Sequence, residues 1–323
     1  MDKTRKKKLL WQVPFLLLLI AGTVFVIRQQ HAMPYQHHQG FVFGTGYNVS
    51  YQADENLQPA IEAELAKVDG EFSMFNDSST VSRMNRGEHP QPSPMFTEVY
   101  ELAQTVSKET DGAFDITVAP LVNAWGFGFK HEQLPTRKQV DSLLLVRNQF
   151  DFAAIAKGYG CDVIARLMQQ RGIQNYMIEI GGEVITKGIS PSRVPWRIGV
   201  VKPTEDTLGT GGELLATLNL SDCSMATSGN YRNFYYKDGK KYAHTIDPHT
   251  GYPVQHSLLS ATVLAPNCAT ADAYATSFMV MGLDKARELL SRHTELMAYF
   301  IYTDEQGQLA VWYSPALKDK IQE

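Results

Sequence analysis

Cysteine is scarce in this sequence of 323 residues. The chain has three, Cys161, Cys223 and Cys268, and no two of them stand in a CxxC spacing. An odd number without that spacing excludes a disulfide framework and a zinc ribbon, and it allows one bridge at most. We expect all three to be small apolar core residues, since free cysteine is among the most buried residue types.

An excess of positive charge is also missing. The formal net charge of the whole chain is −4, and beyond residue 28 the sequence has 24 Lys and Arg against 33 Asp and Glu. Binding to nucleic acid requires a basic face that neutralises phosphates. DNA and RNA are therefore excluded as expected partners.

No internal repeat is present, and with 44% hydrophobic and 20% charged residues the chain can build a full core. A disordered or repeat-only chain is thereby excluded. Strand-like and helix-like segments follow one another without a regular βαβ rhythm, which predicts an α+β fold. Helices are expected at residues 57–72, 96–106, 271–281 and 284–292 and on the stretch that ends at 172. Strands are expected at 41–51, where a glycine turn at 44–46 breaks the strand, and at 175–180, 196–201, 214–218, 258–264, 297–302 and 309–313.

A long hydrophobic run lies at the N-terminus. Residues 9–27 are 19 residues without a charge, directly behind the basic residues 5–8, and about 20 apolar residues cross a bilayer as a helix. The basic cluster is expected to stay in the cytoplasm, with everything after Arg28 on the opposite side. We predict an uncleaved transmembrane anchor rather than a cleaved signal, because the run is long and lacks a good A-x-A site. No cysteine stands directly after the run, so a lipoprotein would have no residue to acylate there.

Three clusters of residues suit chemistry, and the first spans residues 151–158. It places Ile-Ala-Lys-Gly just ahead of an expected helix start. Small residues let a backbone approach a ligand, first-turn N–H groups attract anions, and Lys157 adds a positive charge. An ordinary helix N-terminus would have the same appearance.

The second cluster spans residues 226–254. Residues 228–230 are expected to form a turn and residues 237–240 a hairpin, and Arg232 is a planar donor suited to phosphate. His244 stands in an expected strand just before Ile-Asp-Pro, and histidine exchanges protons near neutral pH. A core histidine with both nitrogens satisfied is the structural alternative.

The third cluster lies at residues 271–276 on a predicted helix. Asp272 and Thr276 are four residues apart and so share one helix face. A carboxylate and a hydroxyl are hard oxygen ligands that suit Mg²⁺, with backbone carbonyls and waters completing the octahedron. A helix-surface Asp with a buried Thr is the commoner explanation of such a pair.

The sequence resembles the ApbE family of FAD:protein FMN transferases. The resemblance rests on six motifs that follow in the family's order: GTGYNVSY (44–51), TDGAFDITVAPLVNAWGFG (110–128), DFAAIAKGYGCD (151–162), IGGE (180–183), ATSGNYRNF with HTIDPHTGYPV (226–254) and ADAYAT (271–276). So long an ordered set is specific, and it favours the functional interpretation of the second and third clusters. It implies one ApbE-like α+β catalytic domain of mixed sheets and helices.

The resemblance implies an extracytoplasmic, Mg²⁺-dependent enzyme that takes FAD as its substrate. Such an enzyme attaches FMN through a phosphoester to a Thr or Ser hydroxyl of a partner protein and releases AMP. The expected acceptor is a subunit of a membrane redox complex or another exported flavoprotein. An exported FAD-binding protein, or an FAD pyrophosphatase that hydrolyses FAD to FMN and AMP, is the alternative. A third hypothesis is an anchored structural or adhesion domain.

The resemblance also implies roles for single residues. The metal ligands are the backbone carbonyl of Ala154 and the side chains of Asp272 and Thr276, and His244 is the favoured catalytic base. The FAD pocket is expected to draw on Phe43, Phe75, Ala113, Phe114, Asp115, Asp151, Lys157 and Ile246, with Arg232 added for its chemistry. Phe43 and Phe75 stand where relatives often carry Met and Tyr, so a hydrogen bond from position 75 is expected to be missing.

The expected organisation follows from the N-terminal run and the extent of the resemblance. It comprises a cytoplasmic basic segment at 1–8, a transmembrane anchor or signal segment at 9–27, a linker at 28–39, the catalytic domain at 40–315 and a C-terminal tail at 316–323. The linker is polar with three histidines, for which metal binding is the less favoured alternative. We expect a single-pass inner-membrane protein with its catalytic domain on the periplasmic side.

Overall fold

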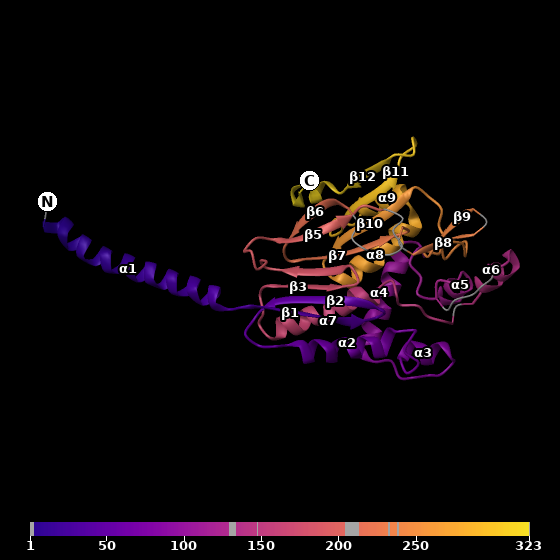
Figure 1. Cartoon of the computed structure of the whole chain (residues 1–323), viewed down its shortest axis with the longest axis horizontal. Helices are drawn as coiled ribbons and strands as arrows, with labels where there is room; N and C mark the ends of the chain where they lie inside the picture. The colour runs from indigo at the N-terminus through magenta and orange to yellow at the C-terminus, as the bar shows by residue number, and fades with distance from the viewer. Residues whose placement is uncertain are drawn as a thin grey trace.

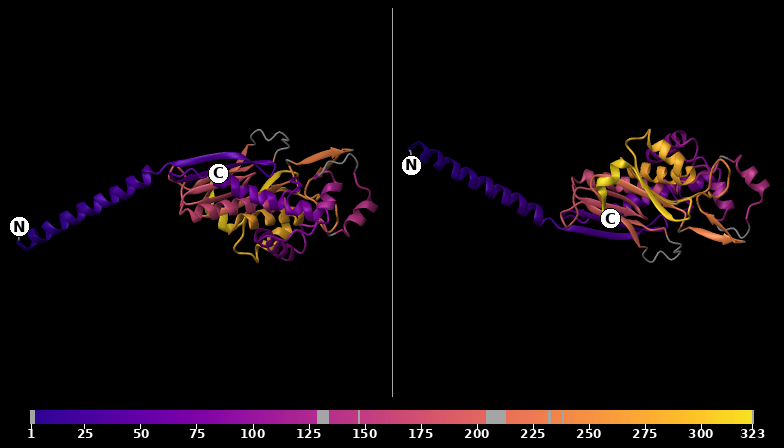
Figure 2. Two further views of the ribbon diagram at one scale, coloured as in Figure 1. Left: turned by 90° about the horizontal axis from the view of Figure 1, so that it is seen from below. Right: turned by 90° about the horizontal axis from the view of Figure 1, so that it is seen from above.

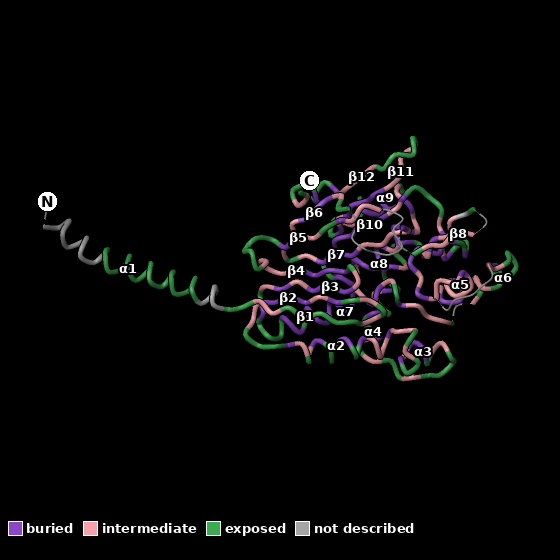
Figure 3. The backbone as a smooth tube through the Cα atoms, viewed as in Figure 1, coloured by how far each residue is buried: buried purple, intermediate pink, exposed green. Residues whose placement is uncertain are grey.

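The computed structural model describes residues 3–128, 134–146, 148–203, 213–231, 233–237 and 239–322, without the side chains of residues 3–11, 29–32 and 240. A long helix, α1 (Lys3–Ala32), leads away from a body of mixed strands and helices (Figure 1, Figure 2). The α1 side chains of residues 12–28 are exposed (Figure 3). In the part of the chain whose side chains are described, no helix is both long enough and apolar enough to span a membrane.

The body is built on a large antiparallel sheet, which has eight strands in the described residues. Their order is β1-β2-β3-β4-β7-β10-β11-β12, with bounds β1 (Tyr35–Val42), β2 (Thr45–Gln52), β3 (Tyr176–Ile180), β4 (Glu183–Lys187), β7 (Cys223–Gly229), β10 (Leu258–Ala265), β11 (Met297–Thr303) and β12 (Leu309–Tyr313). A smaller sheet has the order β13 (Ile321–Gln322), β6 (Leu214–Leu220) and β5 (Trp196–Val201), and β8 (Phe234–Lys237) pairs with β9 (Lys240–Ala243).

Two helices cover one face of the large sheet. Helix α7 (Ala156–Gln170) packs on β3 and β4, α8 (Cys268–Met281) packs on β7 and β10, and α2 (Gln58–Phe72) lies against α7 (Figure 1). The other described helices are α3 (Thr80–Asn85), α4 (Pro94–Glu109), α5 (Ala119–Ala124), α6 (Arg137–Leu143), α9 (Leu283–Leu290) and the 3₁₀ helix η1 (Pro315–Lys320).

The large sheet carries a hydrophobic core on each face. On the helical side, Ile164 of α7 packs with Ile178 and Ile185 of the sheet. On the other side, Val184 of β4 packs with Leu218 of β6, beneath the smaller sheet. Neighbouring residues of a strand point to opposite faces, so Val184 and Ile185 serve different cores. This double coverage buries β4 along most of its length (Figure 3).

The structure confirms the α+β class and most of the predicted elements. The helices predicted at 57–72 and 271–281 correspond to α2 and α8, and the final hairpin is β11 and β12. The strand predicted at 41–51 with a break at the glycine turn 44–46 belongs to a hairpin of β1 and β2, and the turn itself lies slightly earlier, at Phe43-Gly44. Both turn residues have positive φ, 52° and 73°, as a two-residue type I′ turn requires.

The linker predicted at residues 28–39 is wrong. Helix α1 continues to Ala32, and from Tyr35 the chain forms β1, which pairs along its whole length with β2. Strand β1 lies at the edge of the sheet, and none of its residues is classed as buried. An edge strand needs no alternation of apolar and polar residues, which is why its polar sequence resembles a linker.

The C-terminal tail predicted at residues 316–323 is also wrong, because residues 316–322 are folded. They complete η1 and form β13, which pairs with β6. Leu317 is fully buried in the core under the smaller sheet. A single apolar side chain placed by tertiary contacts leaves no periodic pattern in so short a segment.

Candidate active site

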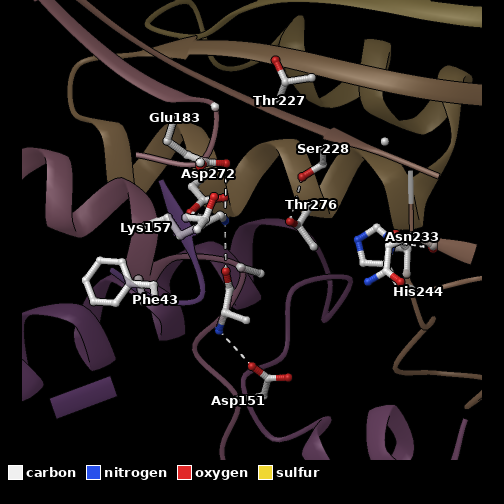
Figure 4. A pocket seen from close by; sticks show the side chains of 18 of the residues that line it. Phe43, Asp151, Lys157, Glu183, Thr227, Ser228, Asn233, His244, Asp272 and Thr276 are labelled. Carbon is white, nitrogen blue, oxygen red and sulfur yellow. Dashed lines mark hydrogen bonds and ion pairs between the residues drawn. The ribbon is translucent and has the colours of Figure 1, made fainter. Parts of the chain in front are cut away.

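A pocket of about 720 Å³ opens where α7 and α8 meet the sheet (Figure 4). Its walls come from the β1–β2 turn, residues 113–115, the start of α7, the start of β4, strands β5 and β7, and α8. The pocket brings together twelve of the residues predicted for the site: Phe43, Phe75, Ala113, Phe114, Asp115, Asp151, Ala154, Lys157, His244, Ile246, Asp272 and Thr276. Arg232, predicted as a phosphate donor, lies outside the described residues.

Gly158 is the point at which α7 touches α8. A Cβ at Gly158 would lie 2.4 Å from the carbonyl oxygen of Cys268, and the Gly158 N–H donates to Asp272 Oδ2 at 3.1 Å. The sequence predicted Lys157 and Gly158 just ahead of a helix. Helix α7 in fact begins at Ala156, so both residues lie in its first turn. The small residue lets two backbones approach each other, whereas the sequence suggested an approach to a ligand.

A second contact sets the position of α8 along α7. The Asp162 carboxylate accepts the N–H groups of Cys268 at 2.8 Å and Ala269 at 2.9 Å, and the Asn267 side chain accepts that of Thr270. Two backbone N–H groups at the start of α8, which have no partner within the helix, therefore donate to a buried carboxylate of α7. Burial raises the pKa of Asp162 to about 6, although the two backbone donors oppose this.

Lys157 lies between two buried carboxylates (Figure 4). Its Nζ is 3.3 Å from Glu183 Oε1 and 3.7 Å from Asp272 Oδ2. Burial raises the pKa of both carboxyls, and the ammonium opposes that rise. Burial alone would lower the pKa of Lys157, but the two carboxylates raise it above its usual range. The amine is thus held as a cation in the pocket, where it can meet an anionic ligand.

The predicted metal ligands are all oxygen donors of this pocket. Asp272 and Thr276 stand one turn apart on α8, and the Thr276 hydroxyl is 3.0 Å from that of Ser228. Carboxylate, hydroxyl and carbonyl oxygens suit Mg²⁺. Within the described residues, no three His, Cys, Asp or Glu side chains gather into a metal cluster.

The sequence predicted His244 inside a strand. In the structure His244 directly follows β9 and lies outside it. Its half-buried ring lies beside Asn233 (Figure 4), and its Nδ1 is 3.2 Å from the Asn233 carbonyl oxygen. Because a carbonyl can only accept, Nδ1 carries the proton of a neutral ring and Nε2 is the basic atom. Burial, with a smaller contribution from the Lys157 charge, lowers the pKa of His244.

The predicted flavin-contacting positions differ in exposure. Phe75 is 72% exposed, whereas Phe114 is 3% exposed. Asp151 accepts the N–H of Ala153 at 2.8 Å, and burial raises the pKa of its carboxyl. The rings of Phe43 and Phe75 offer apolar surface at the pocket to a planar ligand ring.

Three parts of the pocket were not predicted from the sequence. Glu183 lines it, as do residues 198–201 of β5. Ser228 was predicted to begin a turn, but β7 continues through Gly229 and sets Ser228 against Thr276. A signal for Glu183 was available, since it ends the IGGE motif to which no role was assigned.

Comparisons with known proteins agree on one family. The ApbE family model matches residues 43–300. The FAD:protein FMN transferase of Escherichia coli (strain K12) is 33% identical, covering 93% of this chain and 95% of that protein. The one of Haemophilus influenzae is 37% identical, covering 83% and 86%. Among solved structures, the flavin transferase ApbE from Vibrio cholerae aligns with a TM-score of 0.79 at 32% identity, covering 89% of this chain and 99% of that one.

Proposed function

The chain belongs to the ApbE family, and we propose that its pocket binds FAD together with Mg²⁺ and uses His244 as the catalytic base. The chain is an enzyme, a FAD:protein FMN transferase. One observation carries the proposal for the site: twelve residues with an implied role come from distant segments and line the same pocket. Its volume of about 720 Å³ is within the usual range for ligand pockets.

In the proposed reaction, the hydroxyl oxygen of an acceptor Thr or Ser attacks the phosphorus on the flavin side of FAD. A phosphoester bond forms between this oxygen and FMN, and the bond from that phosphorus to the bridging oxygen breaks. AMP leaves with the bridging oxygen, and the hydroxyl proton passes to Nε2 of His244. General-base help of this kind contributes roughly 10²–10⁴-fold to the rate.

The residues of the pocket fit a bound Mg²⁺. The Asp272 carboxylate, the Thr276 hydroxyl and the Ala154 carbonyl would hold it. Glu183 Oε2 is buried and has no hydrogen-bond partner in the part of the chain that is described, so the pocket edge also offers an oxygen acceptor that no described group occupies. When bound, Mg²⁺ neutralises charge on the diphosphate. Lys157 adds a second positive charge on the protein's side.

The N-terminal segment supports a proposed location in the inner membrane. Residues 9–27 carry no charge and follow four basic residues, and the large apolar side chains of α1 are exposed from Val13 to Ile27. Large exposed apolar surfaces mark interaction with a membrane or a partner. The proposed orientation leaves the basic end in the cytoplasm and the body in the periplasm. The acceptor would then be a membrane redox-complex subunit or another exported flavoprotein.

Transfer and hydrolysis are distinguished by the fate of FMN. The full-length protein, purified in detergent, is incubated with FAD, Mg²⁺ and an exported flavoprotein subunit that carries its acceptor Thr. We expect flavin fluorescence in the acceptor band of a denaturing gel, with one AMP released for each flavin attached. A subunit with that Thr changed to Ala is the control and stays dark. Free FMN with an unlabelled acceptor would instead identify an FAD pyrophosphatase.

A further inference from the structure

Glu183 is a pocket residue for which the mechanism above needs no direct contact with FAD. It is the first residue of β4, only 4% of its side chain is exposed, and it lines the pocket. It follows the turn Gly181-Gly182, which joins β3 to β4 and lies beside Lys157 in the first turn of α7. Burying a carboxylate in such a place is costly unless a partner compensates its charge.

The compensating partner is Lys157. The shortest distance from a carboxylate to its ammonium is the 3.3 Å to Glu183 Oε1 (Figure 4). The ammonium also donates to the Ala153 carbonyl at 3.3 Å. Both of these contacts hold Nζ at the edge of the pocket where α7 begins.

The turn before Glu183 makes room for the stem of Lys157. Gly181 has φ +62°, and a Cβ there would lie 3.2 Å from Lys157 Cδ and 2.7 Å from Thr45 Cγ2. The Gly182 N–H donates to Glu179 Oε1 at 2.7 Å, which fixes the turn. The missing side chain at Gly181 therefore leaves room for the lysine stem beside the turn, and Glu183 follows at the end of the turn.

A bound cation would change the balance of charges around Lys157. The second carboxylate near the ammonium, Asp272 at 3.7 Å, is also the proposed metal ligand. A dication held by Asp272 would share the charge of that carboxylate and would repel the ammonium. Glu183 is then the carboxylate that continues to hold Lys157 in place.

We propose that Glu183 is a positioning residue, which acts through Lys157 to keep the ammonium directed at the diphosphate of FAD while Asp272 serves the metal. The proposal rests on the proposed function, since it takes FAD as the ligand. It gives the IGGE motif a physical role. Glu183 itself touches neither FAD nor the attacking hydroxyl.

A double-mutant cycle in FAD affinity tests the proposal. The dissociation constant of FAD is measured by flavin fluorescence quenching, with Mg²⁺ and without an acceptor protein, for the full-length wild type, Glu183→Gln, Lys157→Met and the double variant. We expect Glu183→Gln to weaken binding about tenfold, which corresponds to about 1.4 kcal/mol. The double variant should bind as Lys157→Met does, within about twofold, because a residue that acts through another adds nothing once that residue is gone.

Three results would overturn the proposal. They are unchanged FAD affinity in Glu183→Gln, a double variant whose loss equals the product of the single losses, and a loss of equal size in the control. The control is Glu109→Gln, whose carboxylate contacts Tyr274 of α8 away from the pocket. If Glu183→Gln does not fold, the same cycle is run with Glu183→Asp, which keeps the charge and shortens its reach. Failure of the proposed function has a separate signature, since the wild type would then neither bind FAD nor label an acceptor.

Discussion

At the scale of single residues, the pocket holds neighbouring groups in different charge states. Burial lowers the pKa of His244, which keeps its imidazole neutral. Burial raises the pKa of Asp272, but the Lys157 ammonium and the Gly158 N–H favour its charged form. A base must be neutral, so the environment of His244 suits its proposed role, and a bound dication would add to the two groups that favour the charged form of Asp272.

The first prediction concerns the base. His244→Gln should reduce single-turnover transfer of flavin roughly 10²–10⁴-fold while FAD affinity changes only a few-fold. A neutral base works above its pKa, so the wild-type rate should fall as the pH drops below the lowered pKa of His244, and the variant should lose that acidic limb. Rates from pH 5 to 8, alongside fluorescence titration with FAD, measure both quantities. If affinity and transfer fall together, His244 is a binding residue and not the base.

The second prediction concerns the metal. Asp272→Ala removes the proposed charged ligand and leaves the Gly158 N–H unpaired, which costs about 1–3 kcal/mol of stability, so the protein should still fold. Mg²⁺-dependent cleavage of FAD should be lost. Ser277→Ala is the control, since Ser277 is buried on the same helix and does not line the pocket. Near-normal cleavage by Asp272→Ala across a Mg²⁺ titration would show that the metal is held elsewhere.

At the scale of elements, the site depends on how α7 and α8 are joined. Gly158 removes the side chain at their contact, and Asp162 accepts two N–H groups from the first turn of α8. Lys157 belongs to one helix and Asp272 to the other. A shift of either helix would therefore separate the ion pair and the proposed metal ligands.

The third prediction tests this junction. Gly158→Ala places a Cβ 2.4 Å from the Cys268 carbonyl oxygen, and backbone atoms cannot yield as a flexible side chain does. We expect the free energy of unfolding to fall by about 1–3 kcal/mol and FAD binding to weaken. Gly70→Ala in α2 is the matched control, because nothing lies within 4 Å of its added Cβ and alanine favours a helix by about 0.5–1 kcal/mol. Urea unfolding measures the stability of both variants. Equal free energies of unfolding for Gly158→Ala and Gly70→Ala would show that the contact at Gly158 does not limit the packing of α7 on α8.

At the scale of the whole molecule, a body whose large sheet has a hydrophobic core on each face is joined to one exposed helix. The smaller sheet covers one face of the large sheet and the helices cover the other. Strand β1 continues directly from the α1 region into the edge of that sheet. The chain between helix and body is thus short, which would keep the body close to a membrane that held α1.

The fourth prediction concerns the proposed location. A periplasm-active reporter fused after residue 323 should be active, and the protein should stay in the membrane fraction after a carbonate wash. Changing Leu17 and Leu19 to Arg should weaken that retention, because each charge at the centre of a span costs about 2.5–3.5 kcal/mol. Recovery of wild type from the soluble periplasmic fraction, with its N-terminus beyond residue 27, would overturn the anchor and leave the enzyme unaffected.

What the sequence by itself determined is what depends on local order. Apolar spacing predicted α2 and α4, since a helix that buries one face must repeat its apolar residues every three or four positions. The ordered motifs identified the family, and with it the residues that line the pocket. Asp272 and Thr276 are four apart on one helix, so their proximity also followed from the sequence.

Only the tertiary structure decided which distant residues meet. The Glu183–Lys157 ion pair and the contact of Ser228 with Thr276 join elements that are neighbours only after the sheet has formed. The edge strand β1 and the terminal β13 carry no periodic signal, because they are stabilised by pairing with β2 and β6. Backbone hydrogen bonds between strands are nearly independent of side-chain identity. Such pairings are therefore absent from any local pattern and appear only when the whole chain is packed.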